Sequence, residues 1–216
     1  IVSTVNCSAT VTKMIVEKIK YSNILKDYPN IDGIVPITHS TGCGMNTESE
    51  GMQMFQRTID GFKNHPNFSH VFVIGLGCEC AQVSLFDESL KKHNRIHFLT
   101  IQDEGGTKKI VDKVLSQIKN LLTEANNVER SSQSVGHLTL ALQCGGSDGY
   151  SGITANPALG IAADLLVKKG GSSILSETPE IYGAEHLLIN RANSQETADK
   201  LIKRLEWWKH YTSINN

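Results

Sequence analysis

Short apolar runs alternate with longer amphipathic segments along the chain, and this alternation restricts the fold more than any other feature. The apolar runs predict strands at residues 1–5, 34–37, 71–76, 96–101, 138–142 and 173–175. Most of these runs are continuously apolar, which is typical of strands that are covered on both faces. We therefore predict an α/β fold, with a mainly parallel, Rossmann-like three-layer sheet and helices on both faces.

The length of the chain allows one large domain or two small ones. Its 216 residues include no low-complexity segment, and no change of composition marks an internal boundary. We therefore predict a single α/β domain over residues 1–216. Because Ile1 already lies inside a predicted strand, we expect this domain to be an excised part of a longer chain.

The composition narrows the class of protein. The chain is 39% hydrophobic and 20% charged, which is typical of soluble globular proteins. Its net charge of -1 argues against nucleic acid or an acidic membrane as the main partner. No apolar run approaches the roughly 18 residues of a membrane span. Five cysteines without a secretory signal favour a reducing compartment, and we expect a cytoplasmic location and no disulfide framework.

The stretch 138–160 concentrates polar chemistry where a strand ends. Two glycines follow the apolar residues 138–142, and Asn156-Pro157 predicts a helix start with Asn156 as the cap. Ligands bind at such strand ends in open α/β sheets, and the start of a helix favours an anion. The side chains that we expect to meet a substrate here are Ser147, Ser151, Thr154 and Asn156, in a loop that also carries Cys144 and Asp148.

Thiol, imidazole and carboxylate side chains also follow the other predicted strands. They are Cys7, His39, Cys43, Cys78, Glu79, Cys80, Asp103, Glu104, Glu177 and Glu180. In a parallel sheet these positions share one edge, and thiolate and imidazole suit iron or zinc, so the pattern predicts a metal or iron–sulfur site. Any single cysteine is equally consistent with a small buried apolar residue, and no pair has zinc-finger spacing.

Several common nucleotide and nucleophile motifs are absent from the sequence. Gly75-Leu76-Gly77 lacks the third glycine of a dinucleotide fingerprint. The chain has no phosphate-binding Gly-Lys-Ser loop, no serine-nucleophile elbow and no C-x-x-C before a helix, which argues against a thiol redox protein.

Five segments carry a resemblance to a known family. They are residues 5–9, 38–44, 75–79, 143–160 and 173–186, the fourth beginning Gln-Cys-Gly-Gly-Ser-Asp-Gly. Together they resemble the altronate/galactarate dehydratase family over nearly the whole chain. The resemblance implies an iron-dependent lyase that dehydrates a sugar acid to a 2-keto-3-deoxy acid. It also implies that a small N-terminal domain and a C-terminal half, as domains or separate subunits, are missing partners. Cys80 is not an expected family cysteine.

The resemblance also implies roles for individual residues. We expect His39, Cys43, Cys78 and Cys144 near iron, as Fe²⁺, with an iron–sulfur cluster held by the three cysteines left open. Dehydration removes the C2 proton and expels the C3 hydroxyl, so it needs a base and an acid. The side chains expected to supply or orient these groups are His39, Glu79, Asp148, Glu177 and His186.

Two other functions stay open at this point. Related family members act as sulfo-lyases on sulfolactate, so a sulfolactate-like substrate is one alternative. A non-catalytic binding or assembly domain of a split enzyme is the other. The sequence leaves the oligomeric state open, a homo-oligomer included.

Overall fold

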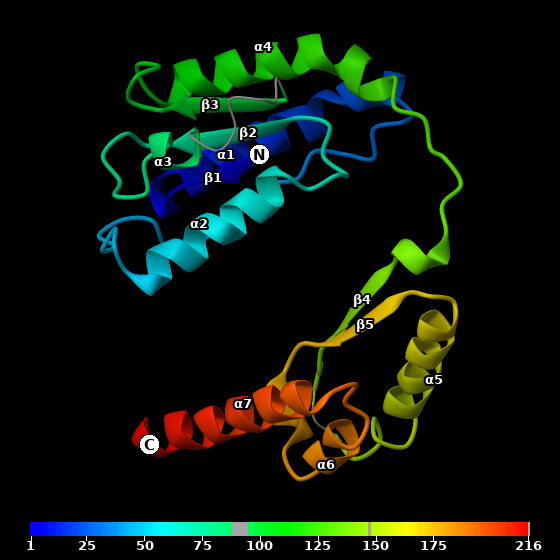
Figure 1. Cartoon of the computed structure of the whole chain (residues 1–216). Coiled ribbons are helices and arrows are strands. Elements are labelled where there is room, and N and C mark those ends of the chain that lie inside the picture. Colours follow the sequence, from blue (N-terminus) through cyan, green and yellow to red (C-terminus); the bar gives the residue numbers. More distant parts are fainter. Residues whose placement is uncertain (88–94, 147, 216) are drawn as a thin grey trace. The chain divides into compact units, whose positions relative to one another are not determined.

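The computed structural model describes residues 1–87, 95–146 and 148–215, and it divides the chain into two compact units (Figure 1). Unit 1 comprises residues 1–130 and unit 2 comprises residues 131–216. From the sequence, a single domain without an internal boundary was predicted. The division falls in the polar stretch 126–134, where Val128 is 59% exposed and residues 131–134 are all exposed.

A parallel sheet organises unit 1. Its elements are β1 (Val2–Ser3), α1 (Asn6–Ser22), the 3-10 turn η1 (Ile24–Asp27), α2 (Glu50–Lys63), β2 (Val71–Gly75), α3 (Ser84–Asp87), β3 (Ile96–Thr100) and α4 (Thr107–Asn126). The strand order is β1-β2-β3. The predicted strand at 34–37 contributes one parallel bridge, from Ile37 to Val2. Pro36 has no N–H to donate, which suits this edge position.

Strand β2 sends alternate side chains to two apolar clusters. Phe72 and Ile74 join a cluster with α1 and α4. Val71 and Val73 join another with α2. Helices therefore lie on both sides of this sheet, with α4 on one side and α2 on the other in Figure 1. The coarser prediction, an α/β fold with parallel strands, is confirmed, whereas the Rossmann-like three-layer arrangement stays a prediction.

The helices of unit 1 follow the apolar spacing of the sequence. In α1 the residues Val11, Ile15 and Ile19, spaced four apart, are all buried, and α4 buries the equivalent row Ile110, Val114 and Ile118. In α2 the buried row includes Met52, Phe55 and Ile59, and Ser49 caps the helix by accepting a hydrogen bond from the backbone N–H of Met52. Because each row faces the sheet, the period of the sequence determines which face of each helix is buried.

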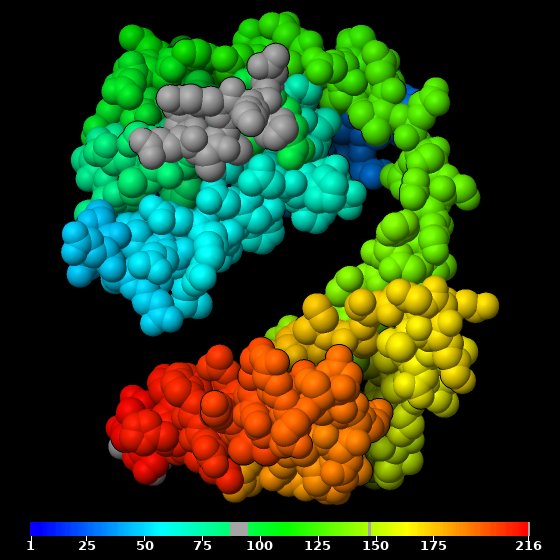
Figure 2. Space-filling model, viewed as in Figure 1, coloured from blue at the N-terminus to red at the C-terminus, as the bar shows by residue number. Residues whose placement is uncertain are grey.

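Unit 2 contains a two-stranded parallel sheet. Its elements are η2 (Val135–His137), β4 (Thr139–Leu142), α5 (Ala155–Lys168), β5 (Ser172–Leu175), η3 (Thr178–Ile181), α6 (Glu185–Ile189) and α7 (Gln195–Ile214). Thr139 pairs with Ser172, and α5 connects the two strands. Helix α5 (yellow in Figures 1 and 2) buries Leu166 alone among its residues. No helix in the described ranges is long and apolar enough to cross a membrane.

The start of α5 differs from the prediction. The helix begins at Ala155, so Asn156 lies in its first turn instead of capping it. The preceding loop is already turned by hydrogen bonds from the backbone N–H groups of Ile153 and Thr154 to the carbonyl of Tyr150. The chain therefore enters the helix earlier than Asn156-Pro157 indicated.

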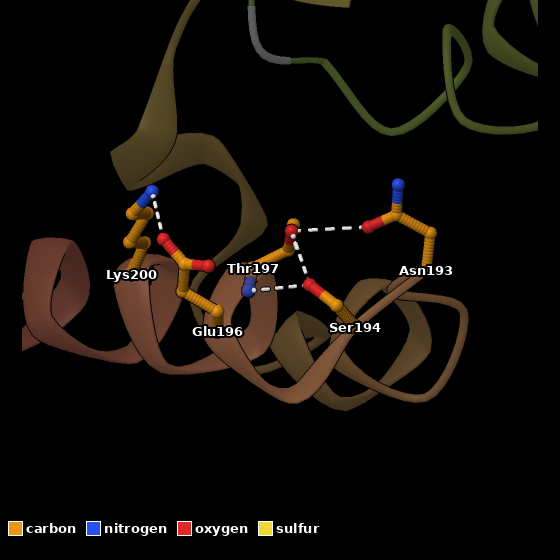
Figure 3. A network of polar contacts seen from close by, with 5 residues as sticks. All are labelled: Asn193, Ser194, Glu196, Thr197 and Lys200. Atoms are coloured by element: carbon orange, nitrogen blue, oxygen red, sulfur yellow. Dashed lines mark hydrogen bonds and ion pairs between the residues drawn. The ribbon is translucent and has the colours of Figure 1, made fainter.

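Helix α7 begins with a side-chain cap (Figure 3). Ser194 caps the helix, its Oγ accepting from the backbone N–H of Thr197 at 3.2 Å. The Thr197 hydroxyl in turn bonds Asn193 Oδ1 at 3.0 Å, and Glu196 pairs with Lys200 at 2.7 Å one turn on. The Ser194 hydroxyl oxygen thus binds one of the otherwise unpaired N–H groups of the first turn.

The two sheets should differ strongly in hydrogen exchange. Unit 2 buries the apolar side chains of Leu166, Ala198 and Leu205 alone among the described residues, whereas β2 of unit 1 is buried throughout. We expect backbone amides of β4 and β5 to exchange at least ~100-fold faster than those of β2 and β3, because poorly buried elements open at low free energy. Native-state hydrogen exchange followed by mass spectrometry measures this difference. The comparison is like for like because the strands of both sheets pair in parallel. Equal protection of the two ladders would contradict it.

Candidate functional site

Three loops of unit 1 meet at the carboxyl edge of its sheet. The backbone N–H of Asn6, after β1, donates to the carbonyl of Thr41 at 2.9 Å. The N–H of Ala81, after β2, donates to the carbonyl of Gly42 at 3.4 Å. The loop 38–44 therefore lies between the other two, as parallel strands require of chain segments that leave the sheet at one edge.

Gly42 allows this loop to lie directly on the end of β1. Its φ is +99°, a left-handed conformation that favours glycine. A Cβ at this position would overlap the carbonyl oxygen of Thr4 and lie 2.8 Å from Cα of Val5. The approach of the two backbones thus depends on the missing side chain.

Glu79 is the buried carboxylate of this edge, with 3% of its surface exposed. Its Oε1 accepts from the hydroxyl of Thr4 at 2.8 Å and from the N–H of Leu76 at 3.0 Å, and its Oε2 accepts from the N–H of Gly77 at 2.6 Å. Burial alone would raise the pKa of Glu79, but the hydrogen bonds from Gly77, from its own N–H, from Thr4 and from Leu76 outweigh burial and lower the pKa below its usual range.

Two glycines make room for this carboxylate. A Cβ on Gly75 would lie 2.6 Å from Glu79 Oε1 and 2.7 Å from Cγ2 of Val83. Gly77, at φ +126°, adopts a backbone conformation that other residues rarely take. The Gly-Leu-Gly run therefore serves to turn the chain around Glu79, and not to bind a dinucleotide.

His39 uses both ring nitrogens within the protein. Nε2 lies 2.8 Å from the carbonyl oxygen of Ser3, and Nδ1 accepts from the N–H of Thr41 at 3.2 Å. This pair of partners assigns the proton to Nε2 of a neutral ring. The ring also packs edge-on against Phe55, at 4.7 Å between centroids. His39 thereby joins loop 38–44 to β1.

The thiols of unit 1 are at the surface. Cys7, Cys43, Cys78 and Cys80 are all exposed, and none of them is in a disulfide. The parallel sheet brings their loops to one edge, while the buried and half-buried positions there belong to Glu79 and His39. Cys43, Cys78 and Cys80 thus lie at exposed loop positions and Cys7 in the exposed first turn of α1, whereas the side chains of His39 and Glu79 face inward.

In unit 2 the pairing of β4 with β5 brings two predicted residues together. The backbone N–H of Cys144, just after β4, donates to Oε2 of Glu177 at 2.7 Å. Glu177 is half-buried and follows β5, while Cys144 is exposed. This contact joins residues 33 positions apart at the carboxyl edge of the small sheet.

The loop between β4 and α5 is held by its own polar side chains. Asp148 Oδ1 accepts from the N–H groups of Tyr150 and Ser151, each at 2.8 Å. The Ser151 hydroxyl donates to the carbonyl of Asp148, and the Thr154 hydroxyl to that of Tyr150, each at 2.9 Å. Asp148 thus forms an Asx turn, and the two hydroxyls bond locally. Ser147 lies outside the described residues.

The other predicted residues of unit 2 lie at helix starts. Asn156 is exposed in the first turn of α5, and His186 is exposed on α6. Next to His186, Glu185 is half-buried, and among the described residues its Oε2 has no hydrogen-bond partner. Glu185 was not among the site residues predicted from the sequence, although its place in an acidic segment after a strand was a usable signal.

Thr4 and Ser8 are further polar residues that the sequence analysis missed. Both are fully buried: the Ser8 hydroxyl donates to the carbonyl of Ile74 at 2.7 Å, and Thr4 donates to Glu79. The run Ser-Thr-Val-Asn-Cys-Ser after β1 held the signal, because polar residues at a buried strand end need partners.

Both units match family models. Residues 1–126 match the model described as "D-galactarate dehydratase/Altronate hydrolase, second domain". Residues 135–216 match "D-galactarate/Altronate dehydratase, C-terminal". The chain belongs to the D-galactarate dehydratase/altronate hydrolase family. The two matched ranges fall on either side of the division between the units.

Curated relatives bear related names. Altronate dehydratase of Escherichia coli (strain K12) is 34% identical over 98% of this chain and 42% of its own length. Altronate dehydratase of Bacillus subtilis (strain 168) is 32% identical over 98% of this chain and 41% of its own length. Galactarate dehydratase (L-threo-forming) of Escherichia coli is 36% identical over 73% of this chain and 32% of its own length. The chain thus spans about two fifths of the altronate dehydratases that it matches.

Within unit 1, the predicted ligands His39, Cys43 and Cys78 do not by themselves make up a metal site. An imidazole that binds a metal needs a nitrogen with a free lone pair. In His39 the lone pair of Nδ1 accepts from the N–H of Thr41, and Nε2 carries the proton that is donated to the carbonyl of Ser3. Within the described ranges, no group of three or more His, Cys, Asp or Glu side chains is placed to hold a metal ion. The fourth predicted ligand, Cys144, belongs to unit 2. The presence of iron stays a prediction.

Two glycine substitutions separate steric fit from backbone strain. We expect Gly42→Ala to lower the free energy of unfolding by roughly 3 kcal/mol, because its Cβ would overlap Thr4. Gly44→Ala is the matched control, since its φ is +65° but a Cβ there meets nothing within 4 Å. It should cost about 1 kcal/mol. Urea unfolding of both variants measures the difference, and equal losses would contradict the packing of this loop on β1.

The carboxylate of Glu79 should make the free energy of unfolding depend on pH in the acid range. Its pKa is lower in the folded state, so its contribution to stability is present above the unfolded-state pKa and is lost as pH falls through the folded-state pKa. At pH 7 we expect Glu79→Gln to cost about 2 kcal/mol, because the amide NH₂ would oppose a backbone donor. Unfolding curves of both proteins from pH 7 to 3 should converge at the acid end. A constant gap would contradict an ionised Glu79.

Proposed function

We propose that this chain is part of a hydro-lyase that dehydrates a sugar acid of the altronate or galactarate type to a 2-keto-3-deoxy acid. Family membership and the alignment of nearly the whole chain with altronate dehydratases support the reaction class. The observation that carries the proposal is the contact between Cys144 and Glu177. It joins the two longest family-like segments, 143–160 and 173–186, at the carboxyl ends of paired strands.

The reaction needs a base at C2 and an acid at C3. A base takes the C2 proton, the C3–O bond breaks, and the departing hydroxyl leaves as water after it is protonated. The enol that remains takes up a proton at C3 and loses the proton of its C2 hydroxyl, which gives the 2-keto-3-deoxy acid. Since the C2 proton next to a carboxylate is weakly acidic, both proton transfers require positioned side chains.

Glu177 and His186 are the side chains that we assign to these transfers. Glu177 is half-buried, and the N–H of Cys144 orients one of its oxygens. His186 is exposed on α6, nine residues further along the chain. Asp148 is less suited because one of its oxygens already accepts two N–H groups. The exposed Asn156, in the first turn of α5, is our candidate to meet the substrate carboxylate.

The whole enzyme is proposed to include more than this chain. The altronate dehydratases that it matches are more than twice as long as the aligned part. We therefore propose that domains corresponding to their remaining length, in the same chain or as subunits, act together with these two units. The greater length of these altronate dehydratases supports this part of the proposal.

Substitution of Glu177 tests the acid/base assignment. In the full-length protein we expect Glu177→Gln to lower kcat for altronate or galactarate by about 100- to 10,000-fold. Glu180→Gln is the matched control, because Glu180 is an exposed acid on the adjoining η3 turn, and it should retain kcat within about threefold. Formation of the 2-keto acid is the measurement, with sulfolactate as a competing substrate. Equal kcat for both variants, or sulfite release from sulfolactate alone, would contradict the proposal.

Iron content should be measured separately from activity. We propose that the anaerobically purified full-length protein carries iron without acid-labile sulfide and that Cys144→Ser lowers its iron content. Matching iron and sulfide would instead indicate a cluster, and intact iron content and turnover in Cys144→Ser would contradict the assignment of this cysteine.

A further inference from the structure

We propose that His39 and Glu79 are positioning residues, which fasten the loops carrying Cys43 and Cys78 to the end of β1 and do not themselves meet the substrate. The inference concerns the architecture of unit 1, and only its turnover readout rests on the proposed function. It reassigns two residues that the sequence predicted as catalytic, and one of them also as a metal ligand.

The contacts of His39 leave no reactive nitrogen. Its Nε2 is 2.8 Å from the carbonyl oxygen of Ser3, and its Nδ1 accepts from Thr41 at 3.2 Å. To bind a metal or to move a proton, the ring would have to give up one of these bonds and with it the tie between loop 38–44 and β1. Phe55, at 4.7 Å, limits rotation of the ring on one side.

The contacts of Glu79 lead to the same end of β1. Three hydrogen bonds, at 2.6 to 3.0 Å, connect both of its oxygens to Thr4, Leu76 and Gly77. With 3% of the residue exposed, a substrate has no path to the carboxylate unless loop 76–80 opens. Glu79 therefore holds the turn that follows β2.

The two loops share one design. In each, an inward-facing polar side chain is bound to β1, and an exposed cysteine lies four residues after His39 or immediately before Glu79. The anchor points on β1 and its end are adjacent, the carbonyl of Ser3 and the hydroxyl of Thr4. The last residue of β1 and the residue that follows it thus set the position of both thiol-bearing loops.

Thr4 allows a test that leaves Glu79 in place. Thr4→Val keeps the shape of the side chain and removes its hydroxyl, whereas Thr4→Ser keeps the hydroxyl. We expect amide exchange of residues 76–80 to rise at least ~10-fold in Thr4→Val, the effect of losing a hydrogen bond to a charged group. Thr4→Ser should stay within about threefold of the wild type. Exchange in β3 and α4 should not change in either variant. No difference between the two variants would overturn the role given to Glu79.

His39 is tested by a pair of substitutions in the full-length protein. His39→Gln keeps a donor that can reach Ser3 but supplies neither an acid/base group nor a good metal ligand, and His39→Leu supplies no polar group. A positioning role predicts that His39→Gln retains at least about a tenth of the wild-type kcat and that His39→Leu loses more, with KM changing little in both. Equal losses of 100-fold or more would overturn the positioning role.

The exchange and turnover measurements fail independently. If the wild type turns over neither altronate nor galactarate, the proposed function is wrong, and exchange at residues 40–44 then decides the role of His39. Faster exchange there in His39→Leu than in His39→Gln supports the role. Unchanged exchange in both variants overturns it.

Discussion

Parallel pairing of neighbouring strands is the constraint on which the rest of this structure depends. It sends every chain segment that leaves β1 and β2 to one edge, where loops from distant parts of the sequence must then be kept apart and in place. The same rule acts in the small sheet of unit 2, where it places Cys144 beside Glu177. In both units the polar side chains at these edges bind backbone groups first, because a turn that leaves a buried strand exposes N–H and C=O groups that need partners.

Sequence periodicity was enough to find the main helices and strands, because the burial of one face determines both the apolar period of the sequence and the element that it forms. The rows Val11, Ile15, Ile19 and Ile110, Val114, Ile118 were readable because a helix buries one face whatever the tertiary context. The division near residue 130 left no such mark, because stretch 126–134 is polar without being rich in glycine or proline. Asn156 was misplaced as a cap because hydrogen bonds to Tyr150 start the helix sooner, and local residue preferences do not include those bonds.

The candidate site was predictable in its location and not in its roles. A histidine or a glutamate after a strand has the same appearance in the sequence whether it meets a substrate or a backbone. For His39 the deciding facts are the positions of Ser3 and Thr41, and for Glu79 those of Thr4 and Gly77. These distances depend on how three loops fold over one another, which no spacing rule encodes. The exposure of the cysteines was also not predictable from the sequence. Free cysteine is often buried in proteins, so only the structure shows that these thiols lie at the surface.

The turn that follows β2 is an anion receptor already filled from within. Two successive N–H groups and a hydroxyl converge on a negative charge, the arrangement by which many proteins recognise phosphates or carboxylates of their ligands. Here the bound anion is the carboxylate of Glu79, a residue of the same turn. The positive potential of these groups is therefore neutralised inside the protein, so this turn offers little attraction to an anionic ligand from outside. The charge of the proposed sugar-acid substrate would then be met by groups outside this turn.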